Sequence, residues 1–177
     1  MTNDLTSDAV HATPVSWTID TLLDALRGDF KEHGLQCAYE LQQRVPDDVE
    51  LQVAGLVHDV AHRVTTEAMH GLVGAEIVRP LFGDRVASLV KLHVDAKRYL
   101  VTVDPEYRST LSPESIHTLA LQGGDMDDVE RAAFEAEPDA DDALVLRRAD
   151  EAAKVEGCDV PGLDRWEAIL RRVALTR

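Results

Sequence analysis

The sequence predicts an all-α protein, because two features of the chain agree. Apolar residues recur at spacings of three and four along almost the whole length, which is the period of helices that bury one face. Helix-capping residues, glycines and prolines separate these apolar stretches at intervals typical of helix ends. The only candidate for a strand is the short stretch YLVTV at residues 99–103.

The expected helices span about residues 16–27, 30–44, 47–63, 68–79, 83–100, 112–122, 127–136, 141–155 and 163–174. Gly28 follows the first helix, Pro46 ends the second, and Pro80 closes the fourth, since proline and the residue before it disfavour helical backbone. Asp47 followed by Glu50 resembles an N-cap with its reciprocal partner and opens the third helix.

The later helices are defined by their start and stop signals. The stretch LSPESIHTLALQGG has Ser112 as its N-cap, Pro113 in the first turn and a glycine pair as its stop. The three helices after it are predicted from apolar spacing alone. Residues 1–14 are polar, and we expect them to form a loose arm that includes a solvated His11, ahead of one helical domain over residues 15–177.

Composition limits the classes of partner. The chain has 177 residues, enough for one domain with a sizeable core, and a formal net charge of −15. This acidity argues against nucleic acid and against an anionic membrane surface as the main partner. No apolar run reaches the length of a membrane span, and the N-terminus lacks the features of a secretory signal. Cys37 and Cys158 are far apart, as expected for ordinary thiols in a reducing cytoplasm.

Five of the seven histidines fall on predicted helices between positions 33 and 93, and most face inward: His33, His58, His62, His70 and His93. His58 and His62 share one face of the third helix, and His93 neighbours Lys97 on the fifth. Each buried imidazole needs a partner, and a metal ion supplies one partner for all of them. Histidine with carboxylate suits iron, manganese or zinc, and the spacing alone does not identify the metal.

The pattern of a lone histidine, a His-Asp doublet and a distant aspartate resembles that of the HD-domain metalloenzymes. The matching residues are His33, His58, Asp59 and Asp150. The segments HDVAH, MHGLVGAEIVRPLFG, LHVDAKRYL, LSPESIHTLALQGG and LRRADEAAK, in this order, are similar to the 2-amino-1-hydroxyethylphosphonate dioxygenase branch. The resemblance covers roughly residues 30–155 and implies an HD-domain helical bundle with a mixed-valent Fe(II)/Fe(III) centre that activates O2.

The resemblance also implies roles for individual residues. The first iron would be bound by His33, His58, Asp59 and Asp150, and the second by Asp59, His70 and His93. Asp59 suits the bridging role, because a carboxylate has two oxygens and can span two cations. The catalytic residues would be Asp59 and His62.

A small anionic substrate follows from the same resemblance, as the phosphonate would be held by Lys97, Ser115 and Arg147 with His62 close by. An arginine fork and a lysine point charge suit a tetrahedral dianion. The alternatives are that Lys97 and Arg147 form a salt-bridged helix face and that Ser115 supports the helix cap. Lys154 shares a helix face with Arg147 and is expected to pair with Asp150 or Glu151, and His117 is expected in the packed core.

The resemblance has one gap. Characterised members carry a tyrosine and a glutamate shortly before the first ligand histidine, where this chain reads LLDALRGDFKEHGLQ, so an amine-bearing substrate is not implied. The leading hypothesis is O2-dependent oxidation, with C–P cleavage, of a 1-hydroxyphosphonate or a similar hydroxylated anion. A phosphohydrolase using Mn, Zn, Ni or Mg is one alternative, and a non-catalytic metal-binding helical module is another. The exact substrate and the oligomeric state do not follow from the sequence.

Overall fold

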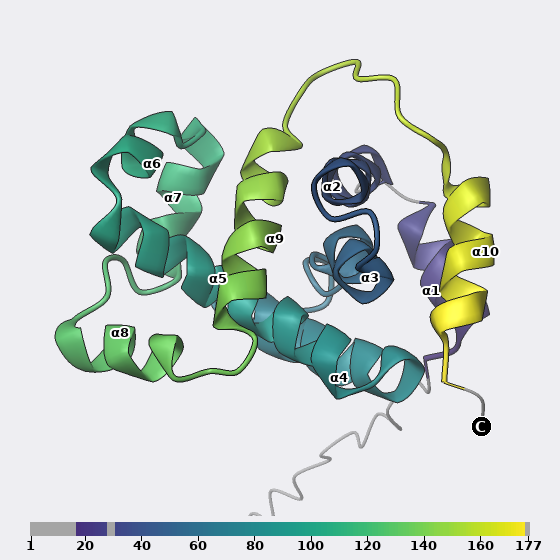
Figure 1. Ribbon diagram of the computed structural model, residues 1–177, viewed down its shortest axis with the longest axis horizontal. Coiled ribbons are helices and arrows are strands. Elements are labelled where there is room, and N and C mark those ends of the chain that lie inside the picture. Colours follow the sequence, from purple (N-terminus) through teal and green to yellow (C-terminus); the bar gives the residue numbers. More distant parts are fainter. Residues whose placement is uncertain (1–16, 28–30, 176–177) are drawn as a thin grey trace, which may run out of the picture.

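The computed structural model describes residues 17–27 and 31–175 and confirms the all-α prediction (Figure 1). These residues contain no strand, and their helices are α1 Ile19–Leu26, α2 Lys31–Arg44, α3 Val49–Val57, α4 His70–Phe82, α5 Asp84–Val103, α6 Pro105–Thr110, α7 Pro113–Leu121, α8 Asp128–Glu135, α9 Ala140–Ala152 and α10 Leu163–Val173. The expected arm over residues 1–14 and the expected start of the second helix near residue 30 lie outside the described residues. No described helix combines the length and apolar character needed to cross a membrane.

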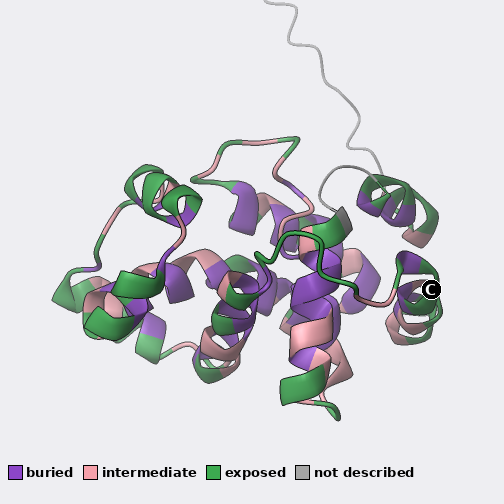
Figure 2. Cartoon of the chain, turned by 90° about the horizontal axis from the view of Figure 1, so that it is seen from above, coloured by how far each residue is buried: buried purple, intermediate pink, exposed green. Residues whose placement is uncertain are grey.

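The pair α2 and α3 forms the centre of the molecule (Figure 1). Helix α9 lies on one side of this pair and α1 with α10 on the other, while α4 and α5 cross beneath it. Helices α6, α7 and α8 gather around the far end of α5. Figure 2 shows that the buried residues lie on the facing sides of these helices, as amphipathic periodicity requires.

A glycine lets α2 approach α3 closely. A Cβ on Gly34 of α2 would lie 2.6 Å from the backbone carbonyl oxygen of Leu56 in α3, and real Cβ contacts are not that short. Because the obstructing atom belongs to the backbone, a side chain cannot turn aside to make room. The close approach holds His33, the residue before Gly34, against the end of α3.

Replacing Gly34 with alanine is therefore expected to destabilise the protein by about 1–3 kcal/mol, the usual cost of overpacking. Urea unfolding of the metal-free protein measures this change. Gly162→Ala is the matched control, because no atom lies within 4 Å of its would-be Cβ. Equal unfolding midpoints for Gly34→Ala and the control would contradict the close-packing argument.

Arg85 at the start of α5 ties three helices together. Its guanidinium donates to both carboxylate oxygens of Asp48 at 2.8 and 2.6 Å, to Glu50 at 3.1 Å and to Asp142 at 2.8 Å. Asp48 also caps α3, and the hydrogen bond from Arg85 lowers the pKa of that carboxyl. The starts of α3, α5 and α9 are thus fixed relative to one another. The cap expected at Asp47 was wrong by one residue.

Helices α4 and α5 both extend beyond their expected ends, at Pro80 and at the β-branched stretch of residues 99–103. Pro80 lies inside α4, which continues through the buried Phe82 to Gly83, whose φ of +90° ends it. The stretch YLVTV belongs to α5 rather than to a strand, because Leu100 and Val101 pack in a small cluster with α6 and α7. Packing outweighed local propensity at both places.

Candidate metal centre

The third helix ends at Val57, not near Arg63 as expected, and the His-Asp doublet lies in the turns that follow. The Nδ1 of His58 donates to the backbone carbonyl of Gly55 at 2.8 Å, and the next backbone bonds join residues three apart, such as His62 to Asp59 at 3.0 Å. Residues in a regular helix point about 100° apart. The tight turns instead bring the side chains of His58 and Asp59 to the same site.

Four imidazoles are oriented in the same way, each by a backbone carbonyl. Their Nδ1 atoms donate to the carbonyls of Ala153 (His33, 3.2 Å), Gly55 (His58, 2.8 Å), Glu67 (His70, 2.6 Å) and Val90 (His93, 2.6 Å). A carbonyl cannot donate, so each Nδ1 carries the proton. In the neutral rings, the Nε2 lone pairs are then available as metal ligands.

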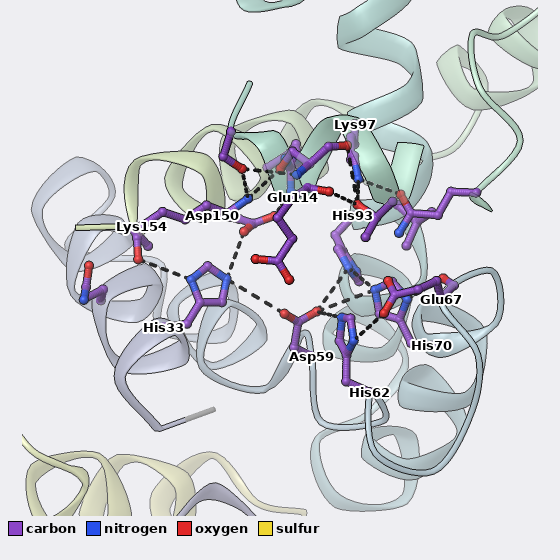
Figure 3. Close-up of a pocket in the computed structure, with 18 of the residues that line it drawn as sticks. His33, Asp59, His62, Glu67, His70, His93, Lys97, Glu114, Asp150 and Lys154 are labelled. Atoms are coloured by element: carbon purple, nitrogen blue, oxygen red, sulfur yellow. Dashed lines mark hydrogen bonds and ion pairs between the residues drawn. The ribbon is translucent and has the colours of Figure 1, made fainter. Parts of the chain in front are cut away.

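Asp59 lies between His33 and His58 on one side and His70 and His93 on the other, and Figure 3 shows it between His33 and the second pair. Its Oδ2 is 3.4 Å from the Nε2 of His58 and 3.8 Å from that of His33. Its Oδ1 is 3.5 Å from the Nε2 of His70 and 3.7 Å from that of His93. The ligand atoms of each pair together with Asp59 lie within 4.8 Å of one another, close enough to share one cation.

Asp150 of α9 completes the first group. Its Oδ1 is 3.0 Å from the Nε2 of His33 and 3.7 Å from that of His58. The other oxygen pairs with Arg147, which is one helical turn earlier and also buried. The charge of Arg147 holds the pKa of Asp150 well below its usual range despite the opposing effect of burial.

The donor atoms are arranged as a metal site requires. The Nε2 of His58 is buried and has no hydrogen bond. The Nε2 atoms of His70 and His93 face each other at 2.9 Å, although each ring already uses its proton on a carbonyl. Two lone pairs at this distance repel unless a cation or an extra proton lies beside them. A set of ligands made only of imidazoles and carboxylates fits iron, manganese or zinc, and no cysteine among the described residues belongs to these groups.

The negative charges of Asp59 and Asp150 favour a cation, either a proton or a metal ion, at this site. Burial lowers the pKa of His58, but the charge of Asp59 outweighs burial and raises that pKa to about 9 in the metal-free chain. Burial and the charge of His58 keep the pKa of His93 well below its usual value. Burial favours a raised pKa for Asp59, yet its histidine neighbours hold it well below.

Metal uptake is therefore expected to strengthen as the pH rises from about 6.5 to about 9. Below the raised pKa, a proton on His58 competes with the metal for the same lone pair, and one such proton changes the apparent Kd about tenfold per pH unit. Calorimetric titration of the metal-free protein with Mn(II), in buffers of different ionisation enthalpy, gives both the affinity and the protons released. An affinity that does not vary over this range would contradict the competition.

Except for the buried His58, the candidate metal ligands line one side of a broad cavity of about 840 Å³ whose lining residues are mostly polar or charged (Figure 3). His62, which is not on a helix, also faces this cavity, with its Nε2 3.1 Å from Asp59 and its Nδ1 3.1 Å from Glu67. Burial lowers the pKa of His62, but the hydrogen bond and charge of Asp59 outweigh it and raise that pKa. His62, Glu67 and His70 form a further group with metal-binding geometry.

Three buried residues bring positive charge and a hydroxyl to another part of the cavity wall: Lys97, Ser115 and Arg147. Lys97 donates to Thr118 at 2.5 Å and Gln122 at 2.8 Å, and burial lowers its pKa to about 8. The guanidinium of Arg147 is largely engaged, since it contacts Asp150, Glu151, Ser115 and Tyr107.

Lys154 pairs as expected, whereas His117 differs from expectation. The ammonium of Lys154 pairs with Glu151 at 3.0 Å as expected, but not with Asp150, and it also donates to Ser115 at 2.6 Å and lines the cavity. It directly follows Ala153, the C-cap of α9. His117 is exposed on α7 rather than packed in the core, because the buried face of this short helix carries Ser115 and Leu119.

Sequence reasoning missed several polar partners in the site. Thr118 and Gln122 follow Ser115 at spacings of three and seven, so the helical period places them on the same face and could have indicated them. Tyr107, which accepts a hydrogen bond from Arg147 at 2.7 Å, lies on α6, a helix too short to show a period. Glu67 lies outside any helix and had no local signal.

Fold and site together define a class of protein. An all-helical chain that gathers a lone histidine, a His-Asp doublet and a distant aspartate is a histidine–aspartate metalloenzyme. A family model described as HD domain matches residues 31–153, and the chain belongs to this family.

Two curated relatives cover most of the chain. Hydroxymethylphosphonate dioxygenase of Gimesia maris is 39% identical over 146 residues, which are 76% of this chain and 72% of the relative. The [1-hydroxy-2-(trimethylamino)ethyl]phosphonate dioxygenase (glycine-betaine-forming) of Leisingera caerulea is 37% identical over 145 residues, with the same coverage of both chains.

Proposed function

We propose that the protein is an O2-dependent di-iron oxygenase that oxidises a small 1-hydroxyphosphonate and breaks its C–P bond. The observation that carries this proposal is the position of Asp59, whose two oxygens face two separate histidine pairs. A single-metal hydrolase has no need for the second pair, His70 and His93. Both curated relatives are named as phosphonate dioxygenases, which supports the same reaction class.

The distances support the ligand set that the resemblance implies. His33, His58 and Asp150 would hold one iron ion, His70 and His93 would hold the other, and Asp59 would contribute to both. Two bound iron ions of mixed valence supply the redox chemistry that activates O2. The protein contributes the fixed orientation of the ligands and a cavity that takes the substrate next to them.

Substrate binding is assigned to the basic part of the cavity wall. Lys97 offers an ammonium with two neutral hydrogen-bond partners, so its charge is not cancelled by a carboxylate in contact. Ser115 and the partly engaged Arg147 complete the anion site. His62 is placed to exchange a proton at the cavity wall, and Glu67 holds its Nδ1 in position.

The reaction balances without an added reductant. Hydroxymethylphosphonic acid plus one O2 contains the same atoms as formic acid plus phosphoric acid, so the substrate itself supplies the electrons. Release of phosphate from a phosphonate must then require O2, whereas hydrolysis of a phosphate ester must not.

An aerobic and an anaerobic phosphate-release assay on the same iron-loaded protein therefore test the function. We expect O2 uptake equal to the phosphate released from hydroxymethylphosphonate or [1-hydroxy-2-(trimethylamino)ethyl]phosphonate, and no release without O2. Oxygen-independent release from phosphomonoesters or nucleotides would instead identify a phosphohydrolase. Bound metal without turnover of any of these compounds would identify a non-catalytic module.

Lys97→Ala is expected to keep the iron and raise KM for the phosphonate roughly ten- to a hundredfold, as loss of a charge-assisted hydrogen bond does. Steady-state kinetics and iron analysis measure the two quantities. The matched control is Lys91→Ala on the same helix, which removes only a surface ion pair with Glu137. An unchanged KM in Lys97→Ala would remove Lys97 from the anion site.

A further inference from the structure

We propose that a second, smaller cavity behind Asp59 is the binding site through which an apolar gas, O2, reaches the metal centre. This inference rests on the proposed function. The second cavity has a volume of about 250 Å³ and lies between α1 and the segment that follows α3. Its lining consists of Trp17, Asp24, Ala25, Leu26, Gly34, Leu56, Asp59, Val60, Arg63 and Val64.

Asp59 is the only described residue that lines both cavities. Its oxygens face the histidine pairs, and the same residue forms part of the wall of the small cavity. Gly34, in the wall of the small cavity, directly follows the proposed ligand His33 in the chain. The small cavity therefore lies one residue, Asp59, away from the proposed metal centre and approaches it from a different side than the broad cavity.

The lining of the small cavity selects against a charged ligand. Leu26 and Leu56 are buried in it, and Trp17, Val60 and Val64 add further apolar surface. Of the three charged residues in the lining, Asp24 and Arg63 are exposed, and Asp59 turns its carboxylate oxygens toward the histidines. Apolar cavities favour apolar guests such as xenon over water and ions.

The broad cavity has the opposite character. Lys97, Arg147, Lys154 and four histidines line it (His33, His62, His70 and His93), and a bound phosphonate would occupy it beside Asp59. A bound anion would block the entry of O2 through the broad cavity. The small apolar cavity gives O2 a separate route that the anion does not occupy.

Ala25 offers a way to fill the small cavity without touching the metal site, since it is exposed on α1. We expect Ala25→Phe to raise KM for O2 at least threefold, with unchanged iron content and unchanged KM for hydroxymethylphosphonate. Val64→Phe, on the other edge, should act in the same way. The matched control is Ala132→Phe, an exposed alanine on α8, which should change neither constant.

Xenon gives a second readout that needs no turnover. We expect ¹²⁹Xe NMR of the metal-free protein to show a bound signal that Ala132→Phe keeps and that Ala25→Phe and Val64→Phe weaken or lose. O2 uptake with an unchanged KM for O2 in both cavity variants overturns the inference and leaves the proposed function standing. If the unsubstituted protein takes up no O2, the proposed function itself is overturned. If the metal-free protein binds no xenon, the apolar binding site is overturned, whatever the result for O2 uptake.

Discussion

Asp59→Ala will lose most of its iron and all measurable O2 uptake, because this one carboxylate contacts both histidine pairs. In the proposed centre, removing it takes a ligand from each metal and leaves the four Nε2 lone pairs without a shared anion. The loss of iron in Asp59→Ala should exceed the loss in His70→Ala, which removes a ligand from only one of the two proposed iron sites. Iron analysis of anaerobically purified protein, with EPR for a coupled mixed-valent pair, measures the result.

Asp59→Asn is the informative control. It keeps the size and one oxygen but not the charge, so it should bind less iron than the unsubstituted protein and more than Asp59→Ala. A chain with Asp59→Ala that retains two iron ions would show that Asp59 does not join the two groups.

Arg147→Met will destabilise the metal-free protein by about 3–5 kcal/mol, the typical cost of removing one partner from a buried ion pair. Arg147 is buried between Asp150 and Glu151, and its loss leaves both carboxylates without their main counter-charge. Urea unfolding measures the change. Bound metal should restore part of the lost stability, because a cation beside Asp150 replaces some of the missing charge.

Arg147→Lys separates charge from shape. It retains the cation but cannot reach Tyr107, Ser115 and the two carboxylates together, so we expect a smaller loss of stability than in Arg147→Met. Equal unfolding midpoints for Arg147→Met and the unsubstituted protein would mean that the ion pairs contribute nothing to the fold.

The sequence predicted the helices well where packing and local preference agree. Ser112 caps its helix at the expected place, since the capping side chain acts on its own backbone. It failed where tertiary contacts decide. The turns after Val57 depend on His58 bonding to Gly55 and facing other helices, and an uninterrupted apolar stripe gives no sign of this.

The proposed metal ligands were identified by resemblance, and the structure brings those side chains together without testing their roles. Periodicity alone did not reach this far, because it placed His58 and His62 on one helix face and assigned no position to Asp59. The anion site shows a different limit. Residue type suggested that the Arg147 guanidinium could bind an anion. In the structure it already donates to Tyr107, which tertiary structure brings close, and to Glu151, which lies one helical turn further along α9.

The carbonyl groups that orient the imidazoles have a consequence for how this protein can evolve. Every amino acid carries a main-chain oxygen, so an exchange at Val90 or Ala153 alters the side chain and keeps the acceptor for His93 or His33. Both side chains are buried, so packing limits which residues fit there, but any residue that fits leaves the coordinating tautomer unchanged. A comparison of side chains among related sequences would therefore understate how many positions help to orient the histidines of the candidate metal centre.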